Sequence, residues 1–319
     1  MRKVILDGIS LNLQDLIDIG LKKASVALSE EAKNKVKTGR EVVDKIVSEK
    51  GVVYGVTTGF GQFADVVIPQ KDVEQLQYNL IRSHSAGVGD FFPEDIARMI
   101  MVLRVNVLAK GRSGISLEVL ELLVEMINKG IYPLIPEKGS VGASGDLAPL
   151  SHLALILIGE GKARYGNIEG NRKKVLEAAG LQPSRLRAKE GLALINGTQV
   201  MTAVGAKVLY SSLNLIKIAD IAGALTLEAL KGTITAFDER IHKERLYKGQ
   251  QECAENFRKI LTNSEIMESH KDCGKVQDSY TLRCMPQVHG PTRDTLAYVE
   301  KMLTIEMNSA TDNPMVFSE

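Results

Sequence analysis

The sequence predicts a mainly α-helical fold with minor β-structure in its N-terminal part. Of its 319 residues, 44% are hydrophobic but only 5% are aromatic, so the core must consist mostly of aliphatic side chains. Lysine and glutamate, which favour helices, are frequent. Signals for helix starts and ends recur, and one long stretch keeps a helical period. Together these observations predict one domain, with a first region over approximately residues 1–195 and a long-helix bundle over residues 196–319.

Helix boundaries are marked by capping residues, by proline at the start and by glycine at the end. Three helices are predicted between such signals: from Ser29 to Ser48, from Pro93 to Gly111, and from Ser116 to Gly130. A β-hairpin is predicted over residues 162–171, with Gly166 and Asn167 in its turn. We find no internal repeat and no proline- or serine-rich linker.

The longest periodic stretch follows Thr198. Small and apolar residues recur there at alternating spacings of four and three, and polar residues fall outside this stripe. The stripe consists of Val204, Val208, Ser211, Leu215, Ile218, Ala222, Leu225 and Ala229. Because so long an apolar stripe seldom faces solvent, we expect partner helices and a homo-oligomer.

Composition speaks against several classes of protein. The net charge is +1, whereas proteins that bind nucleic acid or acidic membrane surfaces usually carry a basic excess. Cys253, Cys273 and Cys284 show no CxxC spacing, so neither a disulfide framework nor a zinc site is indicated. The N-terminal apolar stretch stops at Asp7, too early for a signal peptide, and no run reaches the ~18 apolar residues of a membrane span. We therefore expect a cytoplasmic protein without a metal.

The stretch Gly139–Pro149 interrupts the helical pattern. One interpretation is a turn into a buried helix that Asp146 caps. The other concerns Ala143, Ser144 and Gly145: a glycine nitrogen is an unhindered nucleophile, and a serine hydroxyl can leave as water, so cyclisation and dehydration would yield a methylidene electrophile. A nucleotide-binding loop is not indicated, because Gly-Lys-Ser/Thr, GxGxxG and a βαβ pattern are all missing.

Two further stretches break the pattern. Residues 54–61 form a glycine- and threonine-rich loop that carries the phenol of Tyr54, either as a surface connection or as a mobile functional loop. In residues 277–287, Tyr280 and Arg283 are three apart, so on a helical turn they share a face. A phenol and a guanidinium could there hold a carboxylate, although an interface salt bridge of Arg283 is the other interpretation.

Four segments together resemble the motifs of the aromatic amino acid ammonia-lyases. GSVGASGDLAPLSHLAL is similar to the signature of that family, and YGVTTGFG, ALINGT and QDSYTLRCMPQ resemble its other motifs in the same chain order. The resemblance spans residues 54–287 and implies a mainly helical homotetramer with active sites shared between subunits. It also implies a 4-methylideneimidazol-5-one group made autocatalytically from Ala143, Ser144 and Gly145, with no metal and no nucleotide.

The resemblance implies roles for single residues as well. Tyr54 would take the β-proton of the substrate, Asp146 would assist cyclisation, and Asn196 would hold the prosthetic group or the amine. Asn196 and Ser144 each precede a helix, and we expect both helix N-termini to point at the electrophile. Further roles are implied at three positions: Tyr280 would hold the prosthetic group or the amine together with Asn196, Gln277 would contact the prosthetic group or the substrate, and Arg283 would bind the substrate carboxylate.

The pair Ser83-His84 bears on the substrate. Histidine-selective members of the family are similar here, whereas tyrosine-selective members have His-Leu and phenylalanine-selective members have Phe-Leu. A desolvated imidazole needs hydrogen-bond partners, which these side chains offer. Thr57-Thr58, however, is more like the phenylalanine lyases. We expect ammonia elimination from L-histidine to trans-urocanate, with phenylalanine or tyrosine lyases or aminomutases of the family as alternatives. His152, in an apolar segment, is expected to be structural.

The segment Ser309–Pro314 resembles a family motif that lies well before the natural C-terminus. We therefore expect the chain to be the N-terminal two thirds of a lyase. The competing hypothesis is an inert helical fragment.

Overall fold

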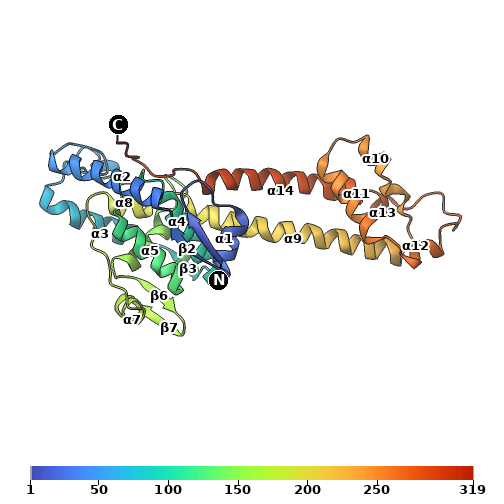
Figure 1. Cartoon of the computed structure of the whole chain (residues 1–319), viewed down its shortest axis with the longest axis horizontal. Helices are drawn as coiled ribbons and strands as arrows, with labels where there is room; N and C mark the ends of the chain where they lie inside the picture. Colours follow the sequence, from blue (N-terminus) through green and yellow to red (C-terminus); the bar gives the residue numbers. More distant parts are fainter. Residues whose placement is uncertain (1, 319) are drawn as a thin grey trace. The chain divides into compact units, whose positions relative to one another are not determined.

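The computed structural model describes residues 2–318, apart from the side chains of residues 62 and 171–173 (Figure 1). The chain forms two compact units: one contains the residues up to Ala206 and those from Leu303 onward, and the other contains Lys207–Met302. Two long helices, α9 (Gln199–Ala229) and α14 (Met285–Met307), belong to both units. The predicted division near residue 195 falls before α9, whereas the two units divide inside it.

Within the described residues, all strands lie in the first unit and form three small sheets. β1 (Arg2–Leu6) and β2 (Ala24–Leu28) pair in parallel, and α1 (Leu13–Gly20) connects them. The other strands are antiparallel: β3 (Val88–Phe91) with β5 (Pro136–Lys138), β4 (Ile131–Pro133) with β6 (Lys162–Tyr165), and β6 with β7 (Ile168–Asn171).

The β1–α1–β2 segment is a small βαβ unit, so the prediction that the chain contains no such pattern is wrong. Its strands are five residues long, and such a short apolar run carries no distinct period. In the turn after β1 the backbone N–H groups bond within the turn: Asp7 Oδ1 accepts from the N–H of Ile9 at 2.8 Å and of Ser10 at 2.9 Å. Without a glycine-rich phosphate loop, this unit gives no support to nucleotide binding.

The predicted helices and the predicted hairpin are confirmed. The helices are α2 (Glu30–Ser48), α4 (Glu94–Leu108) and α5 (Leu117–Lys129). Ser29 Oγ accepts from Ala32 N at 3.0 Å at the start of α2, and Gly130 ends α5 with a φ of 76°. β6 and β7 form the hairpin over residues 162–171.

α4 is the central helix of the first unit, because every residue from Ile96 to Leu108 is buried. It packs against α1 and α5. A second group of helices, α3 (Val73–His84), α6 (Leu147–Leu157) and α8 (Glu190–Ile195), packs together. α7 (Arg172–Ala178) lies on the β6–β7 hairpin (Figure 1).

The second unit holds the later part of α9 and most of α14. Shorter elements complete it: the 3₁₀ turn Ile234–Phe237, α10 (Glu239–Lys243), α11 (Lys248–Ile260), α12 (Glu265–Ser269) and α13 (Tyr280–Arg283). Its core contains Phe237 and Phe257, whose stacked rings lie 4.6 Å apart.

The long helix predicted after Thr198 is confirmed as α9, but most of the predicted stripe lies open in the single chain. Val208, Leu215 and Leu225 are each about 60% exposed. The chain buries another face of α9 instead, which contains Ala203, Ala206, Leu209, Ile216, Ala224 and Leu227. The predicted stripe is therefore available to a partner.

Candidate active site

The loop between β5 and α6 carries Ala143, Ser144 and Gly145 in an unusual backbone conformation. Ser144 has a φ of 64° and Gly145 a φ of 98°. A positive φ is uncommon for a residue with a side chain and indicates that the surroundings hold it in place. Ala143 and Ser144 are exposed, Gly145 is half-buried, and Asp146 is buried. The tripeptide thus lies at the surface of the first unit on a buried support.

The support is the turn between α8 and α9. A Cβ on residue 145 would lie 2.5 Å from the carbonyl oxygen of Gly197 and 2.8 Å from its nitrogen, so only glycine fits. The same oxygen accepts from Asp146 N at 2.7 Å. The backbone of the tripeptide is therefore pressed against Gly197.

The predicted cap on α6 by Asp146 is wrong, because this side chain makes no capping bond to α6. It caps α9: Oδ2 accepts from the backbone N–H of Val200 at 3.0 Å and of Met201 at 2.9 Å. Oδ1 accepts from Ser140 Oγ at 2.8 Å. The Asp146 carboxylate thus lies at the N-terminus of α9, where a negative charge is favourable, and the expectation that this N-terminus points at an electrophile on Ser144 stays a prediction.

Asn196 follows α8 and is 5% exposed. Its Nδ2 donates to the carbonyl oxygen of Asn313 at 2.9 Å. Its own backbone oxygen accepts from Arg104 Nη1, also at 2.9 Å. The side chain and the backbone of Asn196 are thus both fixed.

Tyr54 lies in the turn that follows α2 and is 41% exposed, with its ring edge-on to Phe60. The next residue packs tightly: a Cβ on Gly55 would lie 2.8 Å from Leu192 and 3.2 Å from Pro314. Leu192 belongs to α8, which ends at Asn196. The loop of Tyr54 therefore joins the same part of the first unit as Asn196.

Ser83 and His84 end α3. Ser83 Oγ donates to the carbonyl oxygen of Leu80 at 3.0 Å, and His84 Nδ1 lies 2.9 Å from the same oxygen. Because a carbonyl oxygen only accepts, Nδ1 is the donor in this contact, and Nε2 is the ring nitrogen that can bind another group. Further along the chain, Gly87 packs against Gly139: a Cβ added to Gly139 would lie 3.0 Å from the Cα of Gly87. The segment after His84 thus adjoins the start of the Ser144 loop.

His152 contributes to this junction. Its Nε2 accepts from Gly87 N at 3.1 Å, and burial lowers the pKa of the imidazole. This is consistent with the structural role that we expected for it.

Gln277, Tyr280 and Arg283 form one cluster in the second unit. The Arg283 guanidinium lies 4.2 Å above the Tyr280 ring, as their spacing predicts. Its Nε donates to Asp278 O at 3.1 Å, and with the Gln277 amide oxygen turned toward it, Nη1 donates at 2.7 Å. The structure therefore divides the predicted site residues into two groups: Tyr54, Ser83, His84, Ala143, Ser144, Gly145, Asp146 and Asn196 in the first unit, and these three in the second.

A family model described as aromatic amino acid lyase matches residues 11–319. The chain belongs to this family. It is 56% identical to a histidine ammonia-lyase of Alkaliphilus oremlandii, an alignment that covers all of this chain and 63% of the relative. It is 54% identical to human histidine ammonia-lyase, covering 98% of this chain and 48% of the human protein. The crystal structure of histidine ammonia-lyase from Trypanosoma cruzi matches with a TM-score of 0.90 at 43% identity, over 100% of this chain and 60% of that one.

Membership in the aromatic amino acid lyase family confirms the predicted family and the mainly α-helical fold. The chain spans 63% of the length of the Alkaliphilus protein and 48% of the human one.

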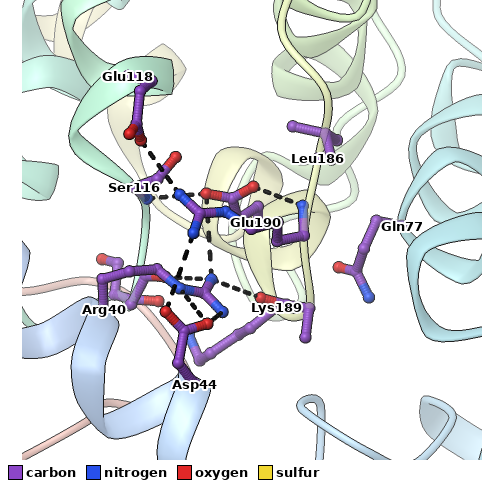
Figure 2. Close-up of polar contacts among 12 residues, drawn as sticks. Arg40, Asp44, Gln77, Ser116, Glu118, Leu186, Lys189 and Glu190 are labelled. Carbon is purple, nitrogen blue, oxygen red and sulfur yellow. Dashed lines mark hydrogen bonds and ion pairs between the residues drawn. The ribbon is translucent and has the colours of Figure 1, made fainter. Parts of the chain in front are cut away.

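A network of buried charges supports the first turn of α8 (Figure 2). Lys189 Nζ donates to Asp312 Oδ2 at 3.2 Å, and Glu190 Oε1 accepts from Ser116 N at 2.8 Å. Burial lowers the pKa of Lys189, and the charge of Asp312 opposes this effect. Arg40 donates to two backbone carbonyl oxygens beside them. α8, which positions Asn196, is thus fixed at its start.

The residues that hold Asn196 in place, above all Arg104 and Asn313, are not predicted from the sequence. One signal was available for Arg104. It lies in a helix whose other residues from Ile96 to Leu108 are almost all apolar, and a charged side chain in such a helix must be buried with polar partners. Asn313 lies in the segment Ser309–Pro314 that resembles a family motif, but the motif does not indicate its contact with Asn196, because the backbone oxygen makes it.

Among residues 2–318, one group has the spacing of metal ligands: Asp220, Cys253 and His289 lie within 4.8 Å of one another. The Asp220 carboxylate already accepts from His289 Nδ1 at 2.8 Å, from Asn256 Nδ2 at 2.9 Å and from the Arg293 guanidinium. A metal ion would face the charge of Arg293. Burial also raises the pKa of the Cys253 thiol, which disfavours the thiolate that metals bind. We assign this group to the core of the second unit.

Proposed function

We propose that the protein is an ammonia-lyase that converts L-histidine to trans-urocanate and ammonia. The observation that carries this proposal is the Ala143–Ser144–Gly145 turn, held with Ser144 at positive φ and pressed against Gly197. The names of the relatives, histidine ammonia-lyase, support it.

The residues around the turn fit a 4-methylideneimidazol-5-one group. Ring closure requires the Gly145 nitrogen near the Ala143 carbonyl carbon, and the close packing of Gly145 on Gly197 would favour such a compressed backbone. Asp146, buried and bonded to Ser140 and to α9, keeps the loop in position. When formed, the group would supply an electrophile that attracts the amino group of the substrate.

The residues of this chain would perform the remaining tasks. Asn196 donates through Nδ2 to Asn313, so its Oδ1 can accept from the ammonium group of the substrate. The β-proton of an amino acid is only weakly acidic, and its removal needs a positioned base. We assign this role to Tyr54, because the packing of Gly55 on Leu192 ties the Tyr54 turn to the helix that ends at Asn196.

Ser83 and His84 favour histidine over an apolar amino acid. With Nδ1 donating to Leu80 O, Nε2 of His84 would accept the N–H of a substrate imidazole when it carries no proton itself. A phenyl ring would leave this acceptor without a partner when it is desolvated, which disfavours phenylalanine.

Thr57 and Thr58, which resemble the phenylalanine lyases, are weak evidence about the substrate once their contacts are considered. Both side chains are buried and bind the loop itself: Thr57 Oγ1 donates to Gly51 O at 2.6 Å, and Thr58 Oγ1 donates to Gly59 O at 3.0 Å. Their identity therefore bears on the structure of the loop more than on the substrate.

We assign binding of the substrate carboxylate to Arg283, with Gln277 and Tyr280 beside it. The guanidinium would offer two parallel N–H donors to a carboxylate once the Gln277 amide turns away from Nη1 and Nη2. In a homotetramer with shared sites, this cluster would serve a tripeptide of the same or of another copy.

The exposed stripe of α9 supports association of this chain with further copies. By length and composition alone, the helical stretch Glu190–Ala229 could also cross a membrane. Asp220, however, lies in this stretch and binds Arg293 and His289, so the helix carries a buried charged cluster. From the exposed stripe we infer a tetramer, and from the charged cluster we infer that it lies in the cytoplasm and not in a membrane. The net charge of +1 disfavours nucleic acid as a partner.

Turnover of L-histidine, L-tyrosine and L-phenylalanine by the complete protein, followed by the absorbance of each product, tests the proposal. We expect urocanate from histidine and little product from the other two. A preference for tyrosine or phenylalanine would refute the substrate assignment. An intact mass equal to that of the linear chain would refute the prosthetic group.

A further inference from the structure

Arg104 is a fully buried charge in the first unit. It lies in α4 with no exposed surface, and burial lowers its pKa to about 10. Among the described residues, no carboxylate forms an ion pair with it; Asp312, whose charge acts on it, is bound to Lys189. A buried charge without an ion pair is costly, so it must be held by other polar groups.

Those groups belong to the turn that supports the tripeptide. Arg104 Nη1 donates to Asn196 O at 2.9 Å and to Gln199 Oε1 at 2.6 Å, and Nη2 donates to Ala193 O. Ala193 and Asn196 lie at the C-terminal end of α8, where carbonyl oxygens have no partner within the helix and a positive charge is favourable. A planar guanidinium can serve several oxygens at once.

The guanidinium also contacts Gly197 directly. A Cβ on residue 197 would collide with Arg104 Nη1 and with Gln199 Oε1. On its other side, Gly197 offers the carbonyl oxygen that accepts from Asp146 N and against which Gly145 is pressed. Gly197 therefore lies between Arg104 and Gly145, so a displacement of the guanidinium would be transmitted to the tripeptide through Gly197.

We propose that Arg104 is a positioning residue for the cyclisation of Ala143–Ser144–Gly145, an inference that rests on the proposed function. In this reaction the Gly145 nitrogen bonds to the Ala143 carbonyl carbon, and the carbonyl oxygen leaves as water with the amide hydrogens of Ser144 and Gly145. The Ser144 hydroxyl then leaves as a second water with the Cα hydrogen of the same residue. Neither step requires an oxidant or a reductant.

Arg104 acts by holding the surface against which Gly145 must be compressed. It also fixes the backbone of Asn196, so a shift of the guanidinium would move both the tripeptide support and the Asn196 amide. A misplacement of about 1 Å can lower the rate of such a reaction by roughly 100-fold.

Arg104→Met tests the inference, and Arg98→Met is the matched control. Arg98 lies in the same helix, is also buried, and also donates to backbone carbonyls, to Ile127 O at 2.9 Å and to Ile19 O at 3.2 Å. These oxygens lie outside the turn of Asn196 and Gly197. Arg104→Lys keeps the charge but not the planar fork, and it serves as a second variant if Arg104→Met does not fold.

The readout is the intact mass of the complete protein, sampled over time after pulsed expression, since cyclisation removes two waters. We expect Arg104→Met to lose the two waters ~100-fold more slowly than the parent, and Arg104→Lys to show an intermediate rate. Arg98→Met should keep the parental rate although its melting temperature is similar to that of Arg104→Met. Parental rates in either Arg104 variant, or equal slowing by Arg98→Met, would overturn the inference. A parent that never loses two waters would instead refute the proposed function.

Discussion

Replacement of Asp146 by alanine provides a direct test of the contact between the Ser144 loop and α9. The change removes the acceptor for the backbone N–H groups of Val200 and Met201 and for Ser140 Oγ. Val200 is 6% exposed, so water cannot easily replace the carboxylate, whereas Met201 is 61% exposed and its N–H can be hydrated. One buried donor without a partner costs about 1–3 kcal/mol, and the lost charge at the helix N-terminus about 1 kcal/mol.

We therefore expect Asp146→Ala to destabilise the first turn of α9 by about 2–4 kcal/mol. Asp146→Asn should cost only about 1 kcal/mol, because its Oδ1 can still accept from both N–H groups and its Nδ2 can donate to Ser140 Oγ. Ser29→Ala is the matched control, since it removes a single N-cap bond, to Ala32 N on α2, for about 1 kcal/mol.

Hydrogen exchange of the peptide that contains Val200 and Met201 measures this cost locally. Asp146→Ala should lower its protection roughly 30- to 1,000-fold, and Asp146→Asn by about 5- to 10-fold. The reasoning fails if the alanine variant loses no more protection than the asparagine variant. It also fails if protection is lost at the start of α6 and retained on α9, since Asp146 would then cap α6.

Other predictions concern the chemistry and the pH dependence. Ser144→Ala should keep its fold but lose activity by several orders of magnitude, because alanine cannot dehydrate to a methylidene; retained turnover would contradict the prosthetic group. Arg283→Lys should raise the KM for histidine roughly 10- to 100-fold, since lysine lacks the planar two-donor contact, and an unchanged KM would make Arg283 an interface residue. Burial lowers the pKa of His152 below 6.5, so on acidification the imidazole binds a proton in the unfolded chain before it does so in the folded protein. The free energy of unfolding should therefore fall below about pH 6.5, by at most ~1.4 kcal/mol per pH unit. Equal slopes of stability against pH in His152→Gln and in the parent would contradict this. The isolated 319-residue chain should self-associate through the stripe of α9, and a monodisperse monomer in light scattering would argue against it.

The elements that could be predicted from the sequence depend on local signals. Ser29 caps α2 with a bond to a residue three positions away, and Gly130 ends α5 through its own φ. Tyr280 and Arg283 meet because their positions are three apart on one helical turn. Each of these features is determined by a few neighbouring residues, so the pattern alone is sufficient.

The support of the candidate site could not be predicted, because its contacts join distant parts of the chain. Asp146 has the spacing of a cap for α6, yet the donors that it binds belong to Val200 and Met201. Arg104 and Asn313 reach Asn196 from a helix that precedes it and from a segment near residue 314. Helical periodicity likewise identified an apolar stripe on α9 without indicating that the chain itself buries a different face.

The distance in sequence between Ser144 and its support has a consequence for the order of events during synthesis. Gly197, on which Gly145 rests, is translated after the tripeptide, and Asn313, which holds the Asn196 side chain, is translated much later. At about 5–20 residues per second, a ribosome needs on the order of 10–30 s to pass from Ser144 to Asn313. Until Gly197 is in place, we expect the nascent tripeptide to remain a linear loop. Maturation of Ser144 would then begin only after synthesis has passed Gly197, so a chain that ends before Gly197 would retain an unmodified serine.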